Sequence, residues 1–449
     1  MEGIIHALGE FVWGWPLLLL FLGVGLWYTV RLRGIQFRYL FTAFRYVFSS
    51  GQDSGISPYA ALCTALAATI GTGNIVGVAT ALALGGPGAL FWMLFAAFFG
   101  MATQYAECFL AAKYRIAKGF GGPFAYIEKA LGKKKLAKLY AVFGAGAGIL
   151  GVGTVTQVNS ITTAVDSFFP SAQGLLGQSW TVVITGMIVT ILSALVLLGG
   201  AKRISKVCET LVPFMSAIYI ICCLVLLICT RKAIPSAVSL ILRSAFSPKA
   251  ALGAASGISF KMAVRMGVSR GVFTNEAGLG TSAIAAASTN VTDPVRQGLV
   301  SMTGTFIDTI VICTMTGLCL ITTGAWCMPL EGVALTDFAW QTGLPWAHRA
   351  SSFLLMLCLV FFAFATIIGW NFYAESCLRY LTHRYGRLYR FFYLCAIALA
   401  PYYTVRLAWE AADVMNALLA VPNLIALLCL QKSVVRDTRR TLHRKQKIM

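Results

Sequence analysis

One apolar run, residues 58–84, has the length of a membrane-spanning helix but is interrupted at its centre. About 20 consecutive apolar residues span a bilayer core as a helix. The middle of this run reads Gly71-Thr72-Gly73-Asn74, and each glycine costs a helix interior about 1 kcal/mol relative to alanine. Lipid cannot hydrogen-bond exposed backbone groups, so an unwound segment persists only where it lines a cavity or binds a ligand. The sequence therefore predicts a site for a small solute and an ion at residues 71–74.

The composition places the whole chain in a membrane. Hydrophobic residues make up 58% of the 449 residues and charged residues only 12%, which excludes a soluble globular protein. A formal net charge of +20 on a soluble chain would suggest nucleic acid. Here the basic residues lie in short connections between apolar runs and in the tail, which is the positive-inside pattern of membrane proteins. We therefore expect the lipid bilayer as the surroundings and no nucleic-acid partner.

The apolar runs and their basic connections predict eleven transmembrane helices, with the N-terminus outside and the C-terminus in the cytoplasm. Residues 113–138, which follow the third run, carry eight Lys and Arg residues against the single acid Glu128. The basic connection 231–249 falls outside by alternation, and we interpret it as a surface helix. Aromatic and Arg residues alternate over 37–48, which predicts an amphipathic helix on the inner face, with an ordinary connector as the alternative.

Without the first helix, ten helices remain in two groups of five. The predicted units are an N-terminal helix with the amphipathic connection, two five-helix repeats, and a basic cytoplasmic tail: residues 1–57, 58–230, 251–430 and 431–449. Each repeat begins with an interrupted apolar segment, the second at 270–282. Because five is odd, the repeats enter the membrane from opposite sides. Paired interruptions of this kind indicate a transporter site at the bilayer midplane. The predicted fold is an all-α polytopic membrane protein built as a five-plus-five inverted repeat.

An interrupted helix exposes N–H groups at one new end and C=O groups at the other. The N–H ends favour a carboxylate and the C=O ends favour Na⁺ or an ammonium group, so a zwitterionic amino acid plus a cation satisfies both. We expect the backbone N–H groups of Thr72 and Gly73 to bind the carboxylate, with the Asn74 side chain beside them. The ammonium group would bind carbonyls of the second interruption, at Phe273, Thr274 and Asn275.

Five further side chains have open roles. Gln157 either contacts the substrate or hydrogen-bonds another helix. Phe273 and Trp370 either form apolar walls that limit substrate size or pack within the bundle. Asp308 and Glu276 are acids at membrane depth, which makes each a functional candidate. Asp308 alternatively accepts hydrogen bonds from a neighbouring helix, and Glu276 holds either the unwound segment or the ion.

The density of Gly and Ala around both interruptions indicates closely spaced backbones and a small cavity. Such a cavity would accept small apolar amino acids and exclude large ones by steric overlap. Three basic residues near the seventh run are candidate ion-pair partners of Glu276 or Asp308: Lys261, Arg265 and Arg270.

Three blocks of the sequence resemble the alanine or glycine:cation symporter family: residues 71–81 followed by 85–93, residues 273–280, and residues 306–309. The resemblance extends over essentially the whole chain. It implies a sodium-coupled importer of alanine or glycine in the plasma membrane of a bacterium or archaeon. It also implies the LeuT-like fold of the broader amino acid–polyamine–organocation superfamily. We separately expect the functional unit to be a monomer.

The broader superfamily further implies a sodium site between the first broken helix and the ninth helix. Carried over residue by residue, the ligands are the carbonyls of Ala67, Ile70 and Ala363 and the hydroxyl of Thr366. These are oxygen ligands only, which suits a hard cation. Some relatives in the superfamily carry a second hydroxyl directly after the threonine. This chain has Ile367 there, which leaves the site one ligand short.

Three other functions compete with sodium-coupled import. A proton-coupled importer would use Asp308 or Glu276 as the proton carrier. A channel would need a charged ring or a filter repeat, and the sequence shows neither. A membrane-embedded enzyme would need a metal set or a nucleophile–base pair at membrane depth. The 13 Cys residues include no C-x-x-C pair and the 4 His residues lie far apart, so no zinc-type cluster is expected and the enzyme is disfavoured.

Overall fold

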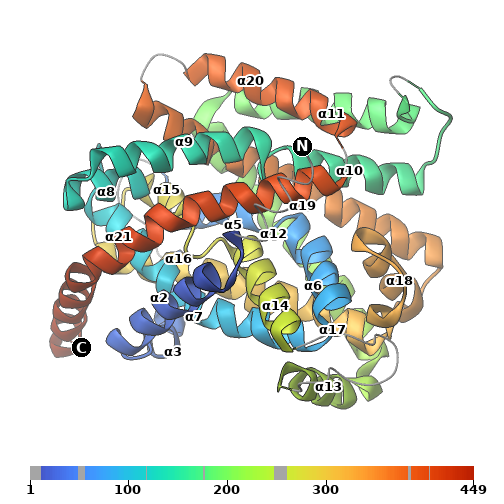
Figure 1. Cartoon of the computed structure of the whole chain (residues 1–449), viewed down its shortest axis with the longest axis horizontal. Coiled ribbons are helices and arrows are strands. Elements are labelled where there is room, and N and C mark those ends of the chain that lie inside the picture. The colour runs from blue at the N-terminus through green and yellow to red at the C-terminus, as the bar shows by residue number, and fades with distance from the viewer. Residues whose placement is uncertain are drawn as a thin grey trace.

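The structure is a computed structural model that describes residues 12–48, 56–117, 119–174, 177–246, 260–382, 386–403 and 405–448. Over these ranges the chain is helical, with only isolated β-bridges between residues, as the sequence predicts. The first eleven residues and the predicted start of the second repeat at residue 251 lie outside the described ranges. Figure 1 shows the helices packed into one layered bundle.

The helices of the N-terminal half are α2 (Trp15–Arg31), α3 (Ile35–Arg38), α4 (Leu40–Phe48), α5 (Pro58–Thr69), α6 (Val78–Gly85), α7 (Gly88–Lys113), α8 (Pro123–Leu131), α9 (Lys134–Leu150), α10 (Val155–Phe168), α11 (Trp180–Leu197) and α12 (Gly200–Cys229). Those that follow are α13 (Ile234–Phe246), α14 (Phe260–Asn275), α15 (Thr281–Ala287), α16 (Pro294–Thr305), α17 (Thr314–Thr322), α18 (Gly332–Gly343), α19 (His348–Leu381), α20 (Gly386–Leu399) and α21 (Val405–Ile448). Two π-helical segments are η1 (Gly73–Gly77) and η4 (Phe306–Cys313).

Both predicted interruptions are present. The first apolar segment consists of α5, an unwound stretch, η1 and α6, and its two halves are bent by 53°. The second consists of α14 and α15, separated by residues 276–280. Pro58 in the first turn of α5 and the hydroxyl of Ser57, which accepts the N–H of Ala60, fix where α5 begins.

Each of the eleven predicted runs contains a helix within the described residues. Among these residues, seven helices are long and apolar enough to cross a membrane, or eight if the bent pair counts as one span. The surface helix predicted in 231–249 is present as α13, and the segment 37–48 forms α3 and α4. Residues 431–448, predicted as a tail, continue α21 as one helix.

Two features were not foreseen. The fourth predicted helix, over residues 139–165, is not continuous: α9 and α10 are separated by residues 151–154. A β-carbon on Gly153 would lie 2.7 Å from Cβ of Trp370, so this break allows α19 to come close. The connection between the predicted eighth and ninth transmembrane helices contains the helix α18.

Helix α7 supports the second broken segment along much of its length. A β-carbon on Gly267 of α14 would lie 2.4 Å from the carbonyl oxygen of Ala89, so these two backbones are in direct contact. On the same helix α7, the backbone beside Gly88 contacts Ser244 of α13. Close approach through small residues is the usual way in which membrane helices pack.

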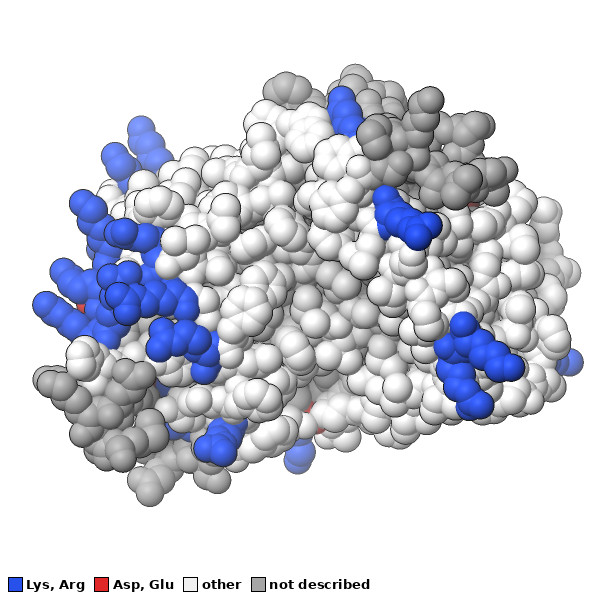
Figure 2. All heavy atoms as spheres, turned by 90° about the horizontal axis from the view of Figure 1, so that it is seen from below, with Lys and Arg blue, Asp and Glu red and all other residues white. Residues whose placement is uncertain are grey.

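Charge is distributed unevenly along the long axis of the molecule. Figure 2 shows the largest gathering of Lys and Arg at one end, a broad uncharged zone beside it, and smaller basic groups toward the other end. In Figure 1 this end holds α8 and the C-terminal part of α21, whereas α18 lies at the opposite end. An uncharged zone flanked by charge fits a protein that crosses a bilayer along this axis.

Candidate functional site

The first break is closed mainly by its own asparagine. Helix α5 ends where Ile70 leaves the helical region, with ψ at 93°. The N–H of Gly71 then donates to Oδ1 of Asn74 at 2.9 Å, and the N–H of Asn74 donates to the carbonyl of Gly71 at 3.2 Å. The N–H of Thr72 donates to Oε1 of Gln157 on α10 at 3.4 Å. Gln157, whose role was open, therefore reaches the backbone of the first break.

The two glycines of this break are required by close contacts. A β-carbon on Gly71 would lie 2.4 Å from Oγ1 of Thr366 on α19. A β-carbon on Gly73 would lie 2.8 Å from Cγ2 of Thr274, the penultimate residue of α14. Contacts between real β-carbons and other heavy atoms are essentially never this short. The first break is therefore pressed against α19 on one side and against the second break on the other.

The second break has a strained backbone. Glu276 has φ at +56°, a left-handed conformation that is uncommon outside glycine, and Gly278 and Gly280 also have positive φ. Glu276 is held there by two side chains: its Oε1 accepts the indole N–H of Trp370 at 2.8 Å and its Oε2 accepts the hydroxyl of Thr281 at 2.5 Å. This geometry fits the expectation that Glu276 holds the unwound segment.

Three buried side chains that sequence reasoning missed also hold the second break. Asn423 on α21 donates to the carbonyl of Gly278 at 2.9 Å and to Oε1 of Glu107 on α7 at 2.5 Å. The hydroxyl of Tyr140 on α9 donates to the carbonyl of Leu279 at 2.9 Å. A signal was available for Glu107, since it is an acid inside the third apolar run. The other two are separated from the break by more than a hundred residues and carry no local signature.

Asp308 accepts hydrogen bonds from neutral donors, and Arg270 binds a different acid. Asp308, in η4, accepts the Asn74 amide at 2.8 Å and the hydroxyl of Thr309 at 2.7 Å. Arg270 instead makes two hydrogen bonds to the carboxylate of Asp413 on α21, at 3.1 and 2.9 Å. The candidate pairing of Arg270 with Glu276 or Asp308 is thus replaced by a pair near one end of the bundle.

Of the four predicted sodium ligands, the structure brings two oxygens together. The hydroxyl of Thr366 lies 3.4 Å from the carbonyl oxygen of Ile70 and 3.1 Å from that of Phe362. Ala67 and Ala363 are also fully buried, on helices α5 and α19, which pack against each other. The carbonyl of Ile367, next in sequence, accepts the hydroxyl of Tyr393 at 2.7 Å.

The two aromatic candidates differ in position. Trp370 is fully buried and its indole N–H is engaged by Glu276. Phe273 stacks on Trp409, with ring centroids 5.1 Å apart, and the guanidinium of Arg270 lies 5.5 Å from each ring. The Arg270 guanidinium, the rings of Phe273 and Trp409, and the Asp413 carboxylate form a compact, partly buried cluster.

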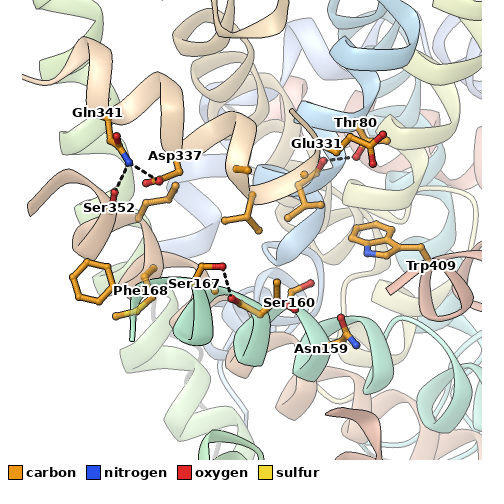
Figure 3. A pocket seen from close by; sticks show the side chains of 18 of the residues that line it. Thr80, Asn159, Ser160, Ser167, Phe168, Glu331, Asp337, Gln341, Ser352 and Trp409 are labelled. Carbon is orange, nitrogen blue, oxygen red and sulfur yellow. Dashed lines mark hydrogen bonds between the residues drawn. The ribbon is translucent and has the colours of Figure 1, made fainter. Parts of the chain in front are cut away.

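This cluster lies at the wall of a large cavity. The cavity has a volume of about 840 Å³ and is lined by η1, α10, α18, the start of α19 and the start of α21. Figure 3 shows Asn159, Ser160 and Trp409 around it, with Gln341 bonded to Asp337 and Ser352 at the far side. Val76 of η1 also lines the cavity, so the cavity extends to the first broken segment.

The model of the sodium:alanine symporter family matches residues 1–448. The chain belongs to this family. It is 48% identical to an uncharacterised transporter of Haemophilus influenzae, over 98% of this chain and 96% of that protein. It is 43% identical to the sodium/alanine symporter AgcS of Methanococcus maripaludis, over 97% of this chain and 96% of that protein.

Among solved structures, the chain resembles MhsT in complex with L-phenylalanine, with a TM-score of 0.56, 13% identity, and coverage of 86% of this chain and 100% of that one. At this identity the likeness concerns the fold, which is the LeuT-like fold expected from the sequence. Membership of the sodium:alanine symporter family makes the chain a membrane transporter and not an enzyme. Coupling to sodium is a property of the family.

Proposed function

We propose that this chain imports small neutral amino acids such as alanine and glycine together with Na⁺, by alternating access. The observation that carries the proposal is the direct contact of the two breaks, where Gly73 lies against Thr274. Two unwound segments in contact place helix-end N–H and C=O groups within one buried volume. The names of the family and of its AgcS member support alanine and sodium as the transported pair.

The carboxylate end of the substrate is assigned to the first break. The hydroxyl oxygen of Thr72 is fully buried and has no hydrogen-bond partner among the described residues. Such an atom costs free energy unless a ligand satisfies it. The backbone N–H groups of Thr72 and Gly73 and the amide of Gln157 lie in the same region. Asn74, by contrast, has its side chain engaged by Gly71 and Asp308, so it shapes the site and contacts the substrate from within that network.

The ammonium end is assigned to the last carbonyls of α14, at Phe273, Thr274 and Asn275. The close packing at Gly73 leaves little room beside the first break, which favours glycine and alanine over larger amino acids. Trp370 acts on this pocket mainly through Glu276, whose strained backbone it holds.

Sodium is assigned to the carbonyls of Ala67, Ile70 and Ala363 and the hydroxyl of Thr366. The short separation of the Thr366 hydroxyl from the Ile70 carbonyl supports this assignment. Because Ile70 directly precedes the proposed substrate-binding residues, sodium and substrate share one unwound turn. Each ligand then helps to order the backbone that binds the other, which is a physical cause of coupling.

The cavity near Arg270 is assigned to the outer face of a prokaryotic plasma membrane. The basic end of the molecule then lies in the cytoplasm, as the positive-inside rule requires, with the N-terminus outside. The repeats 58–230 and 251–430 would supply the two moving halves of a monomeric transporter.

Proton coupling is the second candidate, because Asp308 and Glu276 are buried acids that accept hydrogen bonds from neutral donors. Substrate class is tested with purified protein in liposomes, by competing labelled alanine with glycine, serine, leucine and phenylalanine in the presence of Na⁺. Competition by glycine but not by leucine or phenylalanine supports the proposal. Equal competition by phenylalanine refutes the small-pocket assignment.

A further inference from the structure

A continuous chain of hydrogen bonds runs from the backbone of the first break to the backbone of the second. It begins at the N–H of Gly71, which donates to Asn74. The Asn74 amide donates to Oδ1 of Asp308 at 2.8 Å, and the Thr309 hydroxyl donates to Oδ2 of the same carboxylate at 2.7 Å. Asp308 therefore stands at the centre of the chain as a common acceptor.

The chain continues from Thr309 to the second break. The amide of Asn275 donates to the Thr309 hydroxyl oxygen at 3.1 Å, and Oδ1 of Asn275 accepts the backbone N–H of Ala277 at 3.0 Å. The hydroxyl of Thr274 lies 3.3 Å from that of Thr309 as a side branch. Asn74, Asn275, Asp308 and Thr309 are all buried, and Asp308 and Thr309 have no exposed surface.

The local geometry of η4 makes the bridge feasible. Asp308 and Thr309 are neighbours in sequence, and in a regular α-helix their side chains would diverge by about 100°. Residues 306–313 form a π-helix, which widens the turn at this point. π-Helical turns are rare and occur frequently at functional sites. Here the turn lets one residue reach η1 and the next reach the end of α14.

We propose that Asp308 and Thr309 are positioning residues that transmit the state of the first break to the second. This proposal rests on the proposed function, since it assigns sodium and the substrate carboxylate to the first break and the ammonium group to the second. When Na⁺ orders the first break, it fixes the position of the Asn74 amide and, through it, the Asp308 carboxylate. Through Thr309 and Asn275, the carboxylate then fixes the carbonyls that face the ammonium group. The bridge therefore contributes to the increase in amino-acid affinity that Na⁺ produces.

The test measures alanine affinity of the purified, full-length protein by direct binding, once with saturating Na⁺ and once with Na⁺ replaced by choline. The ratio of the two affinities is the coupling. Thr309→Val keeps the shape of the side chain and removes the hydroxyl, and we expect it to lower this ratio about 3- to 10-fold, the range that one hydrogen bond provides. Thr309→Ser keeps the hydroxyl and should restore the ratio.

Thr314→Val is the matched control, because among the described residues the Thr314 hydroxyl donates to the carbonyls of Ile310 and Thr309, in the segment η4 that directly precedes it. It should leave the ratio unchanged. If alanine binding by the wild type depends on Na⁺ and the folded Thr309→Val variant has the same affinity ratio, the proposed bridge is wrong. A wild type whose alanine binding is indifferent to Na⁺ overturns the proposed function itself. If Thr309→Val does not fold, Asn275→Ala interrupts the same chain one bond later and is read in the same way.

Discussion

Gly71→Ala places one methyl group against the proposed sodium site. The new β-carbon would lie 2.4 Å from Oγ1 of Thr366, well inside any ordinary contact. The Thr366 hydroxyl is tied to the carbonyls of Phe362 and Ile70, and a threonine in a helix has only two favoured side-chain rotamers. Either the hydroxyl turns away from Ile70 or the unwound segment shifts, and both changes separate the two oxygens assigned to Na⁺.

The expected size of the change in Na⁺ dependence follows from the free-energy cost of overpacking. Forcing one methyl group into a filled interior costs about 1–3 kcal/mol. If that cost falls on the sodium-bound state, the Na⁺ concentration for half-maximal alanine uptake rises by about 5- to 150-fold. The assay is uptake of labelled alanine into proteoliposomes as a function of external Na⁺, with sorbitol or choline balancing the osmolarity.

Gly146→Ala provides the control on helix α9. Its β-carbon would have Met415 Sδ as its nearest neighbour, at 3.9 Å, an ordinary contact. Alanine inside a helix should be neutral or slightly stabilising there. An unchanged Na⁺ dependence in well-folded Gly71→Ala, equal to that of Gly146→Ala, would refute the placement of sodium beside Gly71.

Two further experiments test how the second break and the cluster around Arg270 are held. Trp370→Phe removes one of the two donors to the buried carboxylate of Glu276 and should lower the unfolding free energy by about 1–3 kcal/mol in a detergent thermal or denaturant melt. Trp340→Phe should cost clearly less, since that equally buried indole N–H has no partner among the described residues, and equal losses would contradict the role given to Trp370. Asp413→Asn should weaken the half-buried pair with Arg270. The double variant with Arg270→Gln should therefore lose less unfolding free energy than the sum of the two single losses. Strict additivity in the same melt would show that the pair is not coupled.

The two breaks were predictable because glycine and polar residues inside an apolar run contradict both helix propensity and the lipid environment. The repeat pattern predicts that the two breaks form one site, but not that Gly73 packs against Thr274. The family and fold followed from blocks of residues around the same breaks. These are local signals, and a single sequence carries them in full.

The supports of the second break were not predictable in the same way. Glu107, Tyr140 and Asn423 come from three different helices, and each meets the break only after the bundle has formed. The partner of Arg270 was missed for the same reason, since Asp413 follows it by 143 positions. Helix α18 was not predicted, because its 12 residues are too few to give the signal of a membrane-spanning helix.

The proposed function requires that a sodium gradient drives the accumulation of a small amino acid. Its most direct test is uptake of labelled alanine into proteoliposomes at one fixed pH, with an inward Na⁺ gradient in one sample and choline in its place in another. We expect transient accumulation above equilibrium only with the Na⁺ gradient, and no accumulation from an inward proton gradient alone. Equal uptake without Na⁺, or accumulation driven by protons alone, would contradict it.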